Sequence, residues 1–439
     1  MKMPCWKEYR YLMKPVQKYS DKEYGMINKP QVIVIGGGMI TEVQILPSLY
    51  QLKRIGVISD ISVCALNGEP LKRLAESESI KTAFPGFSFR SFPDFTREPL
   101  DKPFPDLYKE VLDQADPGSI AFIALPDQLH YNAIKEALGR NLHVITVKPL
   151  VLKYKEAREI EELAFKKGLF TGIEYHKRSD DRALMARRHY RSGDFGEFML
   201  GQATMVEPWY YRNSNFQNWC TKENSDMFSY VGCHYIDQVH FITGLLPVEI
   251  SVYGIINKYP NGKEGYLYTD GRVIWNNGAC LNVQNAMGYP DIAPGGNTQG
   301  LQMLCRGEKD AGYLFHQDQY RGIKYSLLKK GTQPGDTYYN EPSPDYFKYV
   351  EYGGDGLEPV GYGYRSIQKL LNCVNEVNAR SDLDGRREII QKIDQAGILA
   401  TPANSYYNEL VMEAGRLSIT NSGKPAVITY GKEPSVKLK

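Results

Sequence analysis

Three consecutive glycines follow the first apolar run of the chain. The segment Val34-Ile-Gly-Gly-Gly-Met-Ile-Thr41 continues the β-branched run 31–35, which is typical of a buried parallel strand, and it opens a helical pattern. Gly36 permits a tight turn, Gly38 lets the backbone approach a pyrophosphate, and the amides of the helix start face the phosphate charge. Thr41 replaces the usual third glycine, so we expect looser packing of helix on strand. The pattern predicts a dinucleotide-binding loop.

The residue that would contact the cofactor ribose lies at the end of the second predicted strand, at Asn67. A carboxylate there binds the 2′-hydroxyl of NAD, whereas an arginine accepts the 2′-phosphate of NADP. Asn67 does neither decisively, and the basic residues Lys72 and Arg73 come later in the sequence. We therefore expect NAD, with NADP as an open alternative.

Composition excludes several classes of protein. The 439 residues are 42% hydrophobic and 24% charged with a net charge of +2, which suits a globular protein of two domains without a basic surface for nucleic acid. No run approaches the roughly 18 apolar residues of a membrane span, and none of signal length occurs at the start. Seven scattered cysteines without C-x-x-C spacing argue against disulfides and zinc. We expect a cytoplasmic enzyme that holds no metal.

Strands and helices alternate in the first part of the chain and give way to longer strands after residue 195. Parallel βαβ units are predicted from strands at 61–66, 120–125, 143–147 and 169–175, with helices at 129–138 and 154–167 and a kink at Pro47. Later segments predict strands at 198–206, 249–256, 272–285 and 299–306, with helices at 226–242, 365–378 and 405–419.

These patterns predict two domains of different class. An extension at 1–30 precedes an α/β Rossmann domain with a doubly wound parallel sheet at 31–150. An α+β domain at 151–439 carries a large, mostly antiparallel sheet, and the final helix at 405–419 packs back on the first domain. The stretch 331–361, rich in Pro and Gly, is predicted to be a long excursion or a lid, and loops of this length are usually functional or mobile.

Two further motifs make the assignment sharper. Ala121-Phe-Ile-Ala-Leu-Pro-Asp-Gln-Leu-His130 and Val144-Ile-Thr-Val-Lys-Pro-Leu150 follow the glycine loop in order. Together the three resemble the Gfo/Idh/MocA family of oxidoreductases, in which one strand ends in T-P-x-x-x-H and the next in Glu-Lys-Pro. Further segments are similar to the family's later motifs: Tyr190–Glu197, Gly232–Asp237 and Ala400–Ser405. The resemblance covers most of residues 30–425.

The resemblance implies the reacting residues. Lys148 and His234 correspond to the lysine and histidine that flank the nicotinamide and the substrate carbinol. A neutral imidazole takes a hydroxyl proton as hydride leaves, and a lysine stabilises the developing alkoxide. Val147 replaces the family's Glu, and Tyr230 replaces its Asp four residues before the histidine. On a helix Tyr230, His234 and Asp237 share one face, so we expect Tyr230 to join the proton relay.

Other residues are candidates for contact with the substrate or the cofactor. His176 and Lys177 are predicted to face sugar hydroxyls or an anionic group, while Arg178 reads more simply as a solvated strand end. Asp237 is either a second ligand or a turn cap, and Trp209 either stacks on a sugar or packs internally. His130 is expected to cap its helix. The predicted cofactor contacts are Gly36, Gly38, Met39, Ile40, Asn67, Leu125, Pro126, His130 and Lys148.

The predicted function is an NAD(P)-dependent dehydrogenase that oxidises a secondary hydroxyl of a sugar, glycoside or polyol, such as C3 of a glycoside. Two alternatives stay open: an NAD-dependent glycosidase acting by transient oxidation and elimination, and a non-enzymatic NAD(P) sensor. The presence of Lys148 and His234 favours an enzyme. The family often packs the open faces of its sheets together, so we expect a homo-oligomer.

Overall fold

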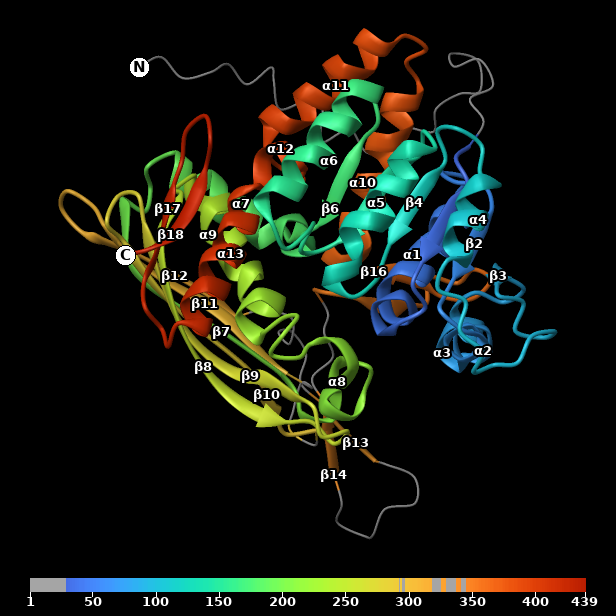
Figure 1. Cartoon of the computed structure of the whole chain (residues 1–439), viewed down its shortest axis with the longest axis horizontal. Helices are drawn as coiled ribbons and strands as arrows, with labels where there is room; N and C mark the ends of the chain where they lie inside the picture. The colour runs from blue at the N-terminus through green and yellow to red at the C-terminus, as the bar shows by residue number, and fades with distance from the viewer. Residues whose placement is uncertain (1–28, 292, 294–296, 318–324, 329–336, 341–344) are drawn as a thin grey trace.

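Two sheets organise the chain (Figure 1). The structure is a computed structural model, and it describes residues 29–439 except 292, 294–296, 318–324, 329–336 and 341–344. The predicted extension at 1–30 therefore lies almost wholly outside the described residues, and the predicted excursion at 331–361 lies partly outside them. Among the described helices, none combines the length and the apolar character needed to cross a bilayer.

The first sheet is a six-stranded parallel sheet in the order β3-β2-β1-β4-β5-β6. Its strands are β1 Val32–Ile35, β2 Ile61–Cys64, β3 Arg90–Phe92, β4 Ile120–Ile123, β5 His143–Val147 and β6 Thr171–Glu174. The strand order reverses between β1 and β4, which is where open α/β sheets bind ligands. The predicted doubly wound Rossmann sheet is confirmed.

Helices cover both faces of this sheet. They are α1 Leu46–Arg54, α2 Gly68–Glu76, α3 Glu78–Ala83, α4 Leu107–Asp113, α5 His130–Gly139 and α6 Tyr154–Lys167, joined by α10 Tyr362–Asn378 and α11 Leu383–Ala396. Ile367 and Leu370 of α10 share a buried core with Val34 and Phe122. The boundary that we predicted at residue 150 thus falls inside the sheet, because a parallel sheet needs cover on both faces and α6, β6, α10 and α11 complete it.

The helix after the glycine loop is irregular where Pro47 enters it. A π-helical turn, η2 Thr41–Ile45, precedes α1, and Pro47 lies in the first turn of α1. Proline has no amide hydrogen to donate to the preceding turn, so the hydrogen-bond ladder changes register there. At the kink that we predicted at Pro47, the structure changes from a π-helical turn to an α-helix.

The second sheet has eight strands in the order β12-β11-β7-β10-β9-β8-β17-β18, and β7–β10 is its parallel pair. Its bounds are β7 Glu197–Pro208, β8 Pro247–Lys258, β9 Glu264–Trp275, β10 Cys280–Tyr289, β11 Thr298–Arg306, β12 Ala311–Gln317, β17 Ala426–Thr429 and β18 Ser435–Leu438. Our single strand at 272–285 was wrong, because a turn at Gly278, with φ of 86°, separates β9 from β10. The mostly antiparallel sheet is confirmed.

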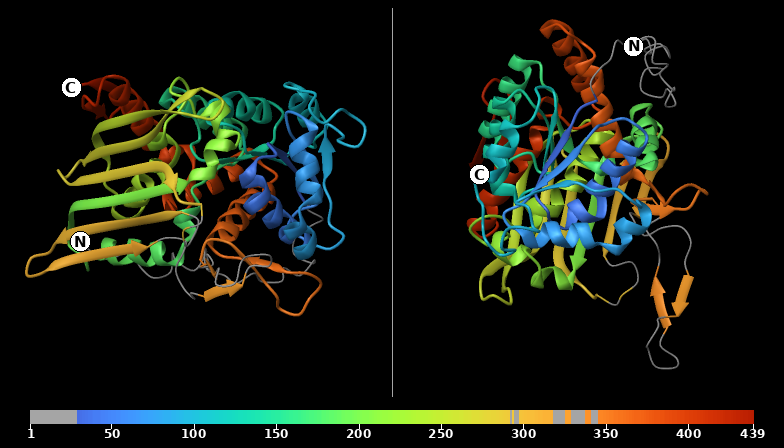
Figure 2. Two further views of the ribbon diagram at one scale, coloured as in Figure 1. Left: turned by 90° about the horizontal axis from the view of Figure 1, so that it is seen from below. Right: turned by 90° about the vertical axis from the view of Figure 1, so that its right-hand side faces the viewer.

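Helices cover one face of this sheet and leave the other open (Figure 2). They are chiefly α7 Asp181–Arg191, α9 Cys233–Thr243 and α13 Tyr407–Thr420, with the short helices α8 Phe216–Trp219 and α12 Pro402–Ser405. Leu410 and Ala414 of α13 share a core with Trp275 of β9, so the last helix packs mainly on this sheet. Two hairpins, β13 Tyr325–Leu328 with β14 Thr337–Asn340 and β15 Lys348–Val350 with β16 Glu358–Val360, lie between β12 and α10.

Candidate active site

The glycine loop brings the backbones of β1 and β4 into contact. Gly36 has φ of +121°, and a Cβ there would lie 2.0 Å from the carbonyl oxygen of Ala124, so only glycine fits. A Cβ on Gly38 would meet no atom within 4 Å. Thr41 is fully buried and its hydroxyl donates to the carbonyl of Gly36 at 2.7 Å. Thr41 therefore closes the loop instead of loosening it as we expected.

The loop and its surroundings fit a dinucleotide. The first amides of a helix have no intrahelical partner, so those at Met39 and Ile40 are donors for a pyrophosphate approaching the open side of Gly38. Asn67 directly precedes α2, in extended backbone. Arg73 turns back from α2 and donates to the carbonyl of Gly37 at 3.2 Å. The sequence analysis had noted only that this arginine comes after Asn67 in the chain.

His130 links two loops at the carboxyl end of the sheet. Its Nε2 lies 2.8 Å from the carbonyl oxygen of Leu125, and its Nδ1 lies 2.8 Å from that of Pro149. The helix α5 begins at this residue, but the side chain makes no capping hydrogen bond. The predicted cap is thus wrong, since the ring instead ties the loop after β4 to the loop after β5.

Lys148 follows β5 and points at Tyr230. Its ammonium donates to the carbonyl of Tyr230 and lies 3.9 Å from the centroid of that ring. Tyr230 belongs to a π-helical turn, η6 Phe228–Gly232, before α9 begins, so the regular helix face that we predicted is interrupted. Burial raises the pKa of Tyr230 well above its ordinary value. The phenol of Tyr230 therefore stays protonated. Lys148 contacts the backbone carbonyl and the ring face of this residue.

Two buried carboxyl groups that we did not predict stand near Lys148. Asp127 follows Pro126 in the loop after β4, and Glu207 lies at the end of β7. Burial raises the pKa of each, that of Glu207 to about 6, while the positive charge of Lys148 opposes both shifts. A charged residue closing an otherwise alternating apolar strand was the available signal for Glu207.

His234 lies in the first turn of α9 and is 5% exposed. Its Nδ1 has no hydrogen-bond partner among the residues that the structure describes. Burial lowers the pKa of His234 well below its usual value, and the charges of Lys148 and Lys177 lower it further. The ring is therefore neutral near pH 7, with polar atoms available to a ligand.

His176 and Lys177 join His234 from the end of β6, in the 3-10 turn η4 His176–Ser179. The ring centroids of His176 and His234 are 4.9 Å apart. Lys177 is 2% exposed and donates to Oε1 of Gln299 at 2.7 Å. Both residues are thus buried beside the predicted histidine.

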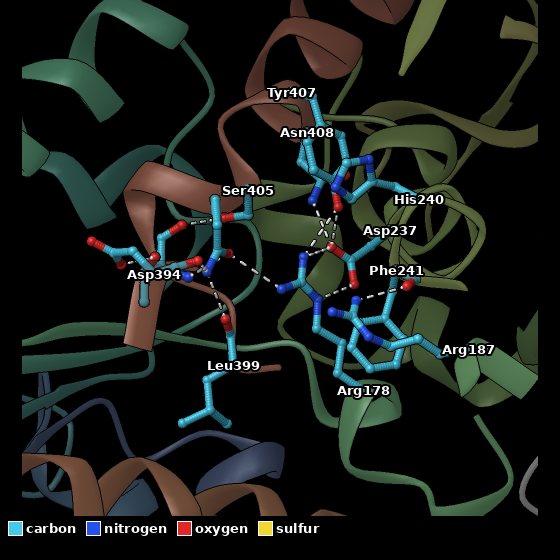
Figure 3. A network of polar contacts seen from close by, with 12 residues as sticks. Arg178, Arg187, Asp237, His240, Phe241, Asp394, Leu399, Ser405, Tyr407 and Asn408 are labelled. Atoms are coloured by element: carbon cyan, nitrogen blue, oxygen red, sulfur yellow. Dashed lines mark hydrogen bonds and ion pairs between the residues drawn. The ribbon is translucent and has the colours of Figure 1, made fainter. Parts of the chain in front are cut away.

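Arg178 and Asp237 form a closed network behind this cluster (Figure 3). Arg178 donates to Oδ2 and Oδ1 of Asp237 at 2.8 and 2.6 Å. Tyr407 and Asn408 donate to Oδ1 at 2.7 and 3.0 Å. Arg178 is 2% exposed, so our solvated strand end was wrong. Asp237 is saturated by protein donors, which corrects its predicted role as a substrate ligand.

The aromatic residues are divided between the surface and the site. Trp209 is 42% exposed, and the guanidinium of Arg212 lies 3.9 Å from its ring centroid, so one ring face is already covered. Phe216 and Trp219 instead pack on Tyr230, with ring centroids 4.8 and 5.6 Å away. Within the described ranges, no three side chains form a metal-ligand cluster.

Comparison with known proteins supports the same reading of the fold. A family model described as oxidoreductase family, NAD-binding Rossmann fold, matches residues 31–175. An uncharacterized oxidoreductase of Schizosaccharomyces pombe is 29% identical over 125 residues, which are 28% of this chain and 34% of the relative. The chain thus spans about a third of the length of the curated relatives that it matches first.

Two solved structures share the whole architecture. The myo-inositol 2-dehydrogenase of Lactobacillus plantarum has a TM-score of 0.58 at 16% identity, over 91% of this chain and 100% of that one. The scyllo-inositol dehydrogenase of Lactobacillus casei, solved with NAD(H) and scyllo-inositol, has a TM-score of 0.56 at 14% identity, over 90% and 96%. Residues 31–175 thus match the NAD-binding Rossmann domain of the Gfo/Idh/MocA oxidoreductases, and the fold of the chain is similar to that of these two inositol dehydrogenases.

Proposed function

We propose that this protein is an NAD-dependent dehydrogenase that oxidises a secondary hydroxyl of a polyol or sugar. The observation that carries the proposal is the approach of Lys148 to the buried, neutral ring of His234, with His176 beside it, at the carboxyl end of the Rossmann sheet. Ligands of open parallel sheets bind at this end. The loop at Gly36–Gly38 lies at the same end of the sheet.

For this reaction the protein must position the substrate and supply a group that accepts the hydroxyl proton. Bound NAD supplies the hydride acceptor. The ammonium of Lys148 holds the hydroxyl oxygen and stabilises charge that develops on it as the proton leaves. A neutral imidazole accepts that proton, a role that the family resemblance gives to His234.

The charge balance of the site favours a neutral substrate. Lys148 and Lys177 are offset by the carboxyl groups of Asp127 and Glu207, so the site carries no strong excess of either sign. Lysine, carboxyl and imidazole groups together donate and accept hydrogen bonds in several directions, as a substrate with many hydroxyl groups requires. The two relatives named above are dehydrogenases of inositols, in keeping with this class.

A substrate panel tests the proposal. The purified protein is mixed with NAD or NADP and with inositols, aldoses, and glycosides, and nicotinamide absorbance is followed. We expect NAD reduction with a neutral polyol or sugar and slower reduction of NADP. Tight NAD binding without reduction on any compound would contradict the proposal. Cleavage of a glycoside without net reduction would support the glycosidase alternative instead.

We also propose that the open face of the eight-stranded sheet is covered by a second copy of the chain. Leu200, Leu304 and Tyr313 stand in register on three neighbouring strands and are 47%, 49% and 56% exposed. A contiguous apolar stripe of this kind marks an interaction surface.

Light scattering after size exclusion tests this oligomer. Leu304→Lys is expected to shift the protein toward monomer, because it places a charge in the centre of the stripe. Met185→Lys is the control, since Met185 is 59% exposed on α7, away from the sheet face. A wild-type monomer, or equal behaviour of the two variants, would contradict the proposed interface.

A further inference from the structure

The end of β6 carries a carboxylate next to the strand that leads to Lys148. Val147 occupies the position of the family's Glu before Lys148, at the end of β5. Glu174 pairs with Val147 in the parallel register of β5 and β6. Paired residues of parallel strands point to the same face of the sheet. A carboxylate therefore lies next to the end of β5, the strand that precedes Lys148, but it belongs to β6.

Glu174 is bound to a histidine of the site. It is 3% exposed, and its Oε2 lies 3.0 Å from Nδ1 of His176. Its Oε1 accepts from Gln44 at 2.9 Å and from the hydroxyl of Ser366. A carboxylate held by this many partners fixes the imidazole tautomer, with hydrogen on Nδ1 and a lone pair on Nε2.

The two histidines of the site differ in their support. His234 has no partner at Nδ1 among the described residues, and the nearby cations Lys148 and Lys177 disfavour a positive charge on its ring. His176 has a carboxylate at Nδ1, the arrangement that stabilises an imidazolium when a base takes a proton. The ring centroids are 4.9 Å apart, which is close enough for one hydroxyl group to contact both rings.

We propose that His176 is the proton acceptor of the oxidation and that Glu174 is its positioning residue, an inference that rests on the proposed function. The O–H bond of the substrate breaks as an N–H bond forms at Nε2 of His176. The electron pair of the carbinol C–H leaves as hydride to oxidised nicotinamide, and the carbonyl forms. The imidazolium, stabilised by Glu174, later releases the proton to water. His234 hydrogen-bonds the same hydroxyl as a neutral ring.

The other groups packed on His176 are mostly uncharged. Tyr346 and Tyr362 contact its ring at 5.2 and 5.8 Å between centroids, and His234 faces it from α9. Lys177 follows it in the chain, and Glu174 is the carboxylate hydrogen-bonded to its ring. Among the described residues, Glu174 is thus the carboxylate in direct contact with the ring of His176.

Steady-state kinetics across pH test the assignment, with NAD and the most active polyol of the panel, beginning with myo-inositol. In wild type, kcat/KM falls on the acid side as the base becomes protonated. Glu174→Gln is expected to move this limb about one pH unit lower, because the ring loses its stabilising charge, and to lower the plateau. Ser366→Ala, which removes a hydrogen bond to Glu174 but keeps the charge, is the matched control and leaves the limb in place.

The histidine variants separate the two rings. His176→Asn is expected to abolish the acid limb and lower kcat/KM by about 10²- to 10⁴-fold. His234→Asn is expected to lower kcat/KM but to keep the limb. Loss of the limb in His234→Asn, with an unmoved limb in Glu174→Gln, would overturn the proposal in favour of His234.

A measurement without substrate keeps this inference distinct from the proposed function. Ring nitrogens of the full chain, labelled with ¹⁵N-histidine, are followed by NMR and assigned with His176→Asn and His234→Asn. We expect the His176 signal to show hydrogen on Nδ1 and to respond to Glu174→Gln. Hydrogen on Nε2 of His176, or no response, would overturn the assignment even in a protein that oxidises polyols.

Discussion

Two polar clusters share the same two elements and differ in how fully they are satisfied. In one, Arg178 of η4 and Asp237 of α9 use both carboxylate oxygens within the protein, with Tyr407 adding a donor. In the other, His176 of η4 meets His234 of α9, whose Nδ1 has no partner among the described residues. Residues only two or three positions apart in the sequence thus have different roles. A polar cluster whose groups are all hydrogen-bonded holds elements together, whereas one with an unpartnered group can bind a ligand.

Breaking the closed cluster is expected to have the largest effect on folding. Asp237→Ala leaves Arg178 buried without its partner, which costs about 3–5 kcal/mol of unfolding free energy. Guanidinium unfolding followed by circular dichroism measures this loss. Asp181→Ala, whose side chain is 66% exposed in the first turn of α7, is the control and changes stability by less than about 1 kcal/mol. Equal stability of the two variants would show that the Arg178 network does not hold the fold.

Breaking the open cluster is expected to affect turnover instead. Lys148→Met removes the cation that contacts Tyr230 and faces Asp127 and Glu207. We expect kcat/KM to fall by about 10²- to 10⁴-fold, since charge stabilisation at the hydroxyl oxygen is lost. NAD affinity, measured by calorimetry, changes little. A variant with wild-type turnover would remove Lys148 from the reaction.

Only some residues of the two clusters could be predicted from the sequence alone. Gly36 was predictable from its place between a buried strand and a helix start, whereas Lys148 and His234 were candidates because their segments resemble motifs of a known family. His176 was also named as a candidate, but its pairing with Glu174 and the place of Glu207 were not predictable, since they depend on which side chains meet after the chain packs. Arg178 was misread because a charged strand end usually lies in water, and only the fold brings Asp237 to it.

Glu409 lies beside the closed network and is the exception within it. It follows Asn408 on α13, is fully buried, and has no side-chain partner in the described part of the chain, while the backbone amides of Leu150 and of Glu409 itself lie near its carboxyl group. Burial raises the pKa of Glu409 from 4.5 to about 8. The folded state therefore holds a proton that the unfolded state has released between these values. The contribution of Glu409 to the free energy of unfolding is fully present below about pH 4.5 and is lost as pH rises toward 8.

The variant Glu409→Gln removes this titration. Between pH 5 and 8 its unfolding free energy is expected to decline less steeply than that of wild type, by up to about 1 kcal/mol per pH unit. Guanidinium unfolding at several pH values measures the two slopes. Identical slopes would mean that Glu409 gains a partner in solution and belongs to the closed network after all.

Transfer of deuterium from substrate to cofactor shows whether the protein moves a hydride at Lys148 and the neighbouring histidines. The protein is incubated with NAD and a polyol or sugar that carries deuterium at its carbinol carbons, and the mass of the nicotinamide cofactor is measured. The account predicts that NADH gains one deuterium with wild type and that none is transferred with Lys148→Met. Cofactor that stays oxidised with every deuterated compound, although it binds tightly, would contradict hydride transfer at Lys148 and its histidine pair.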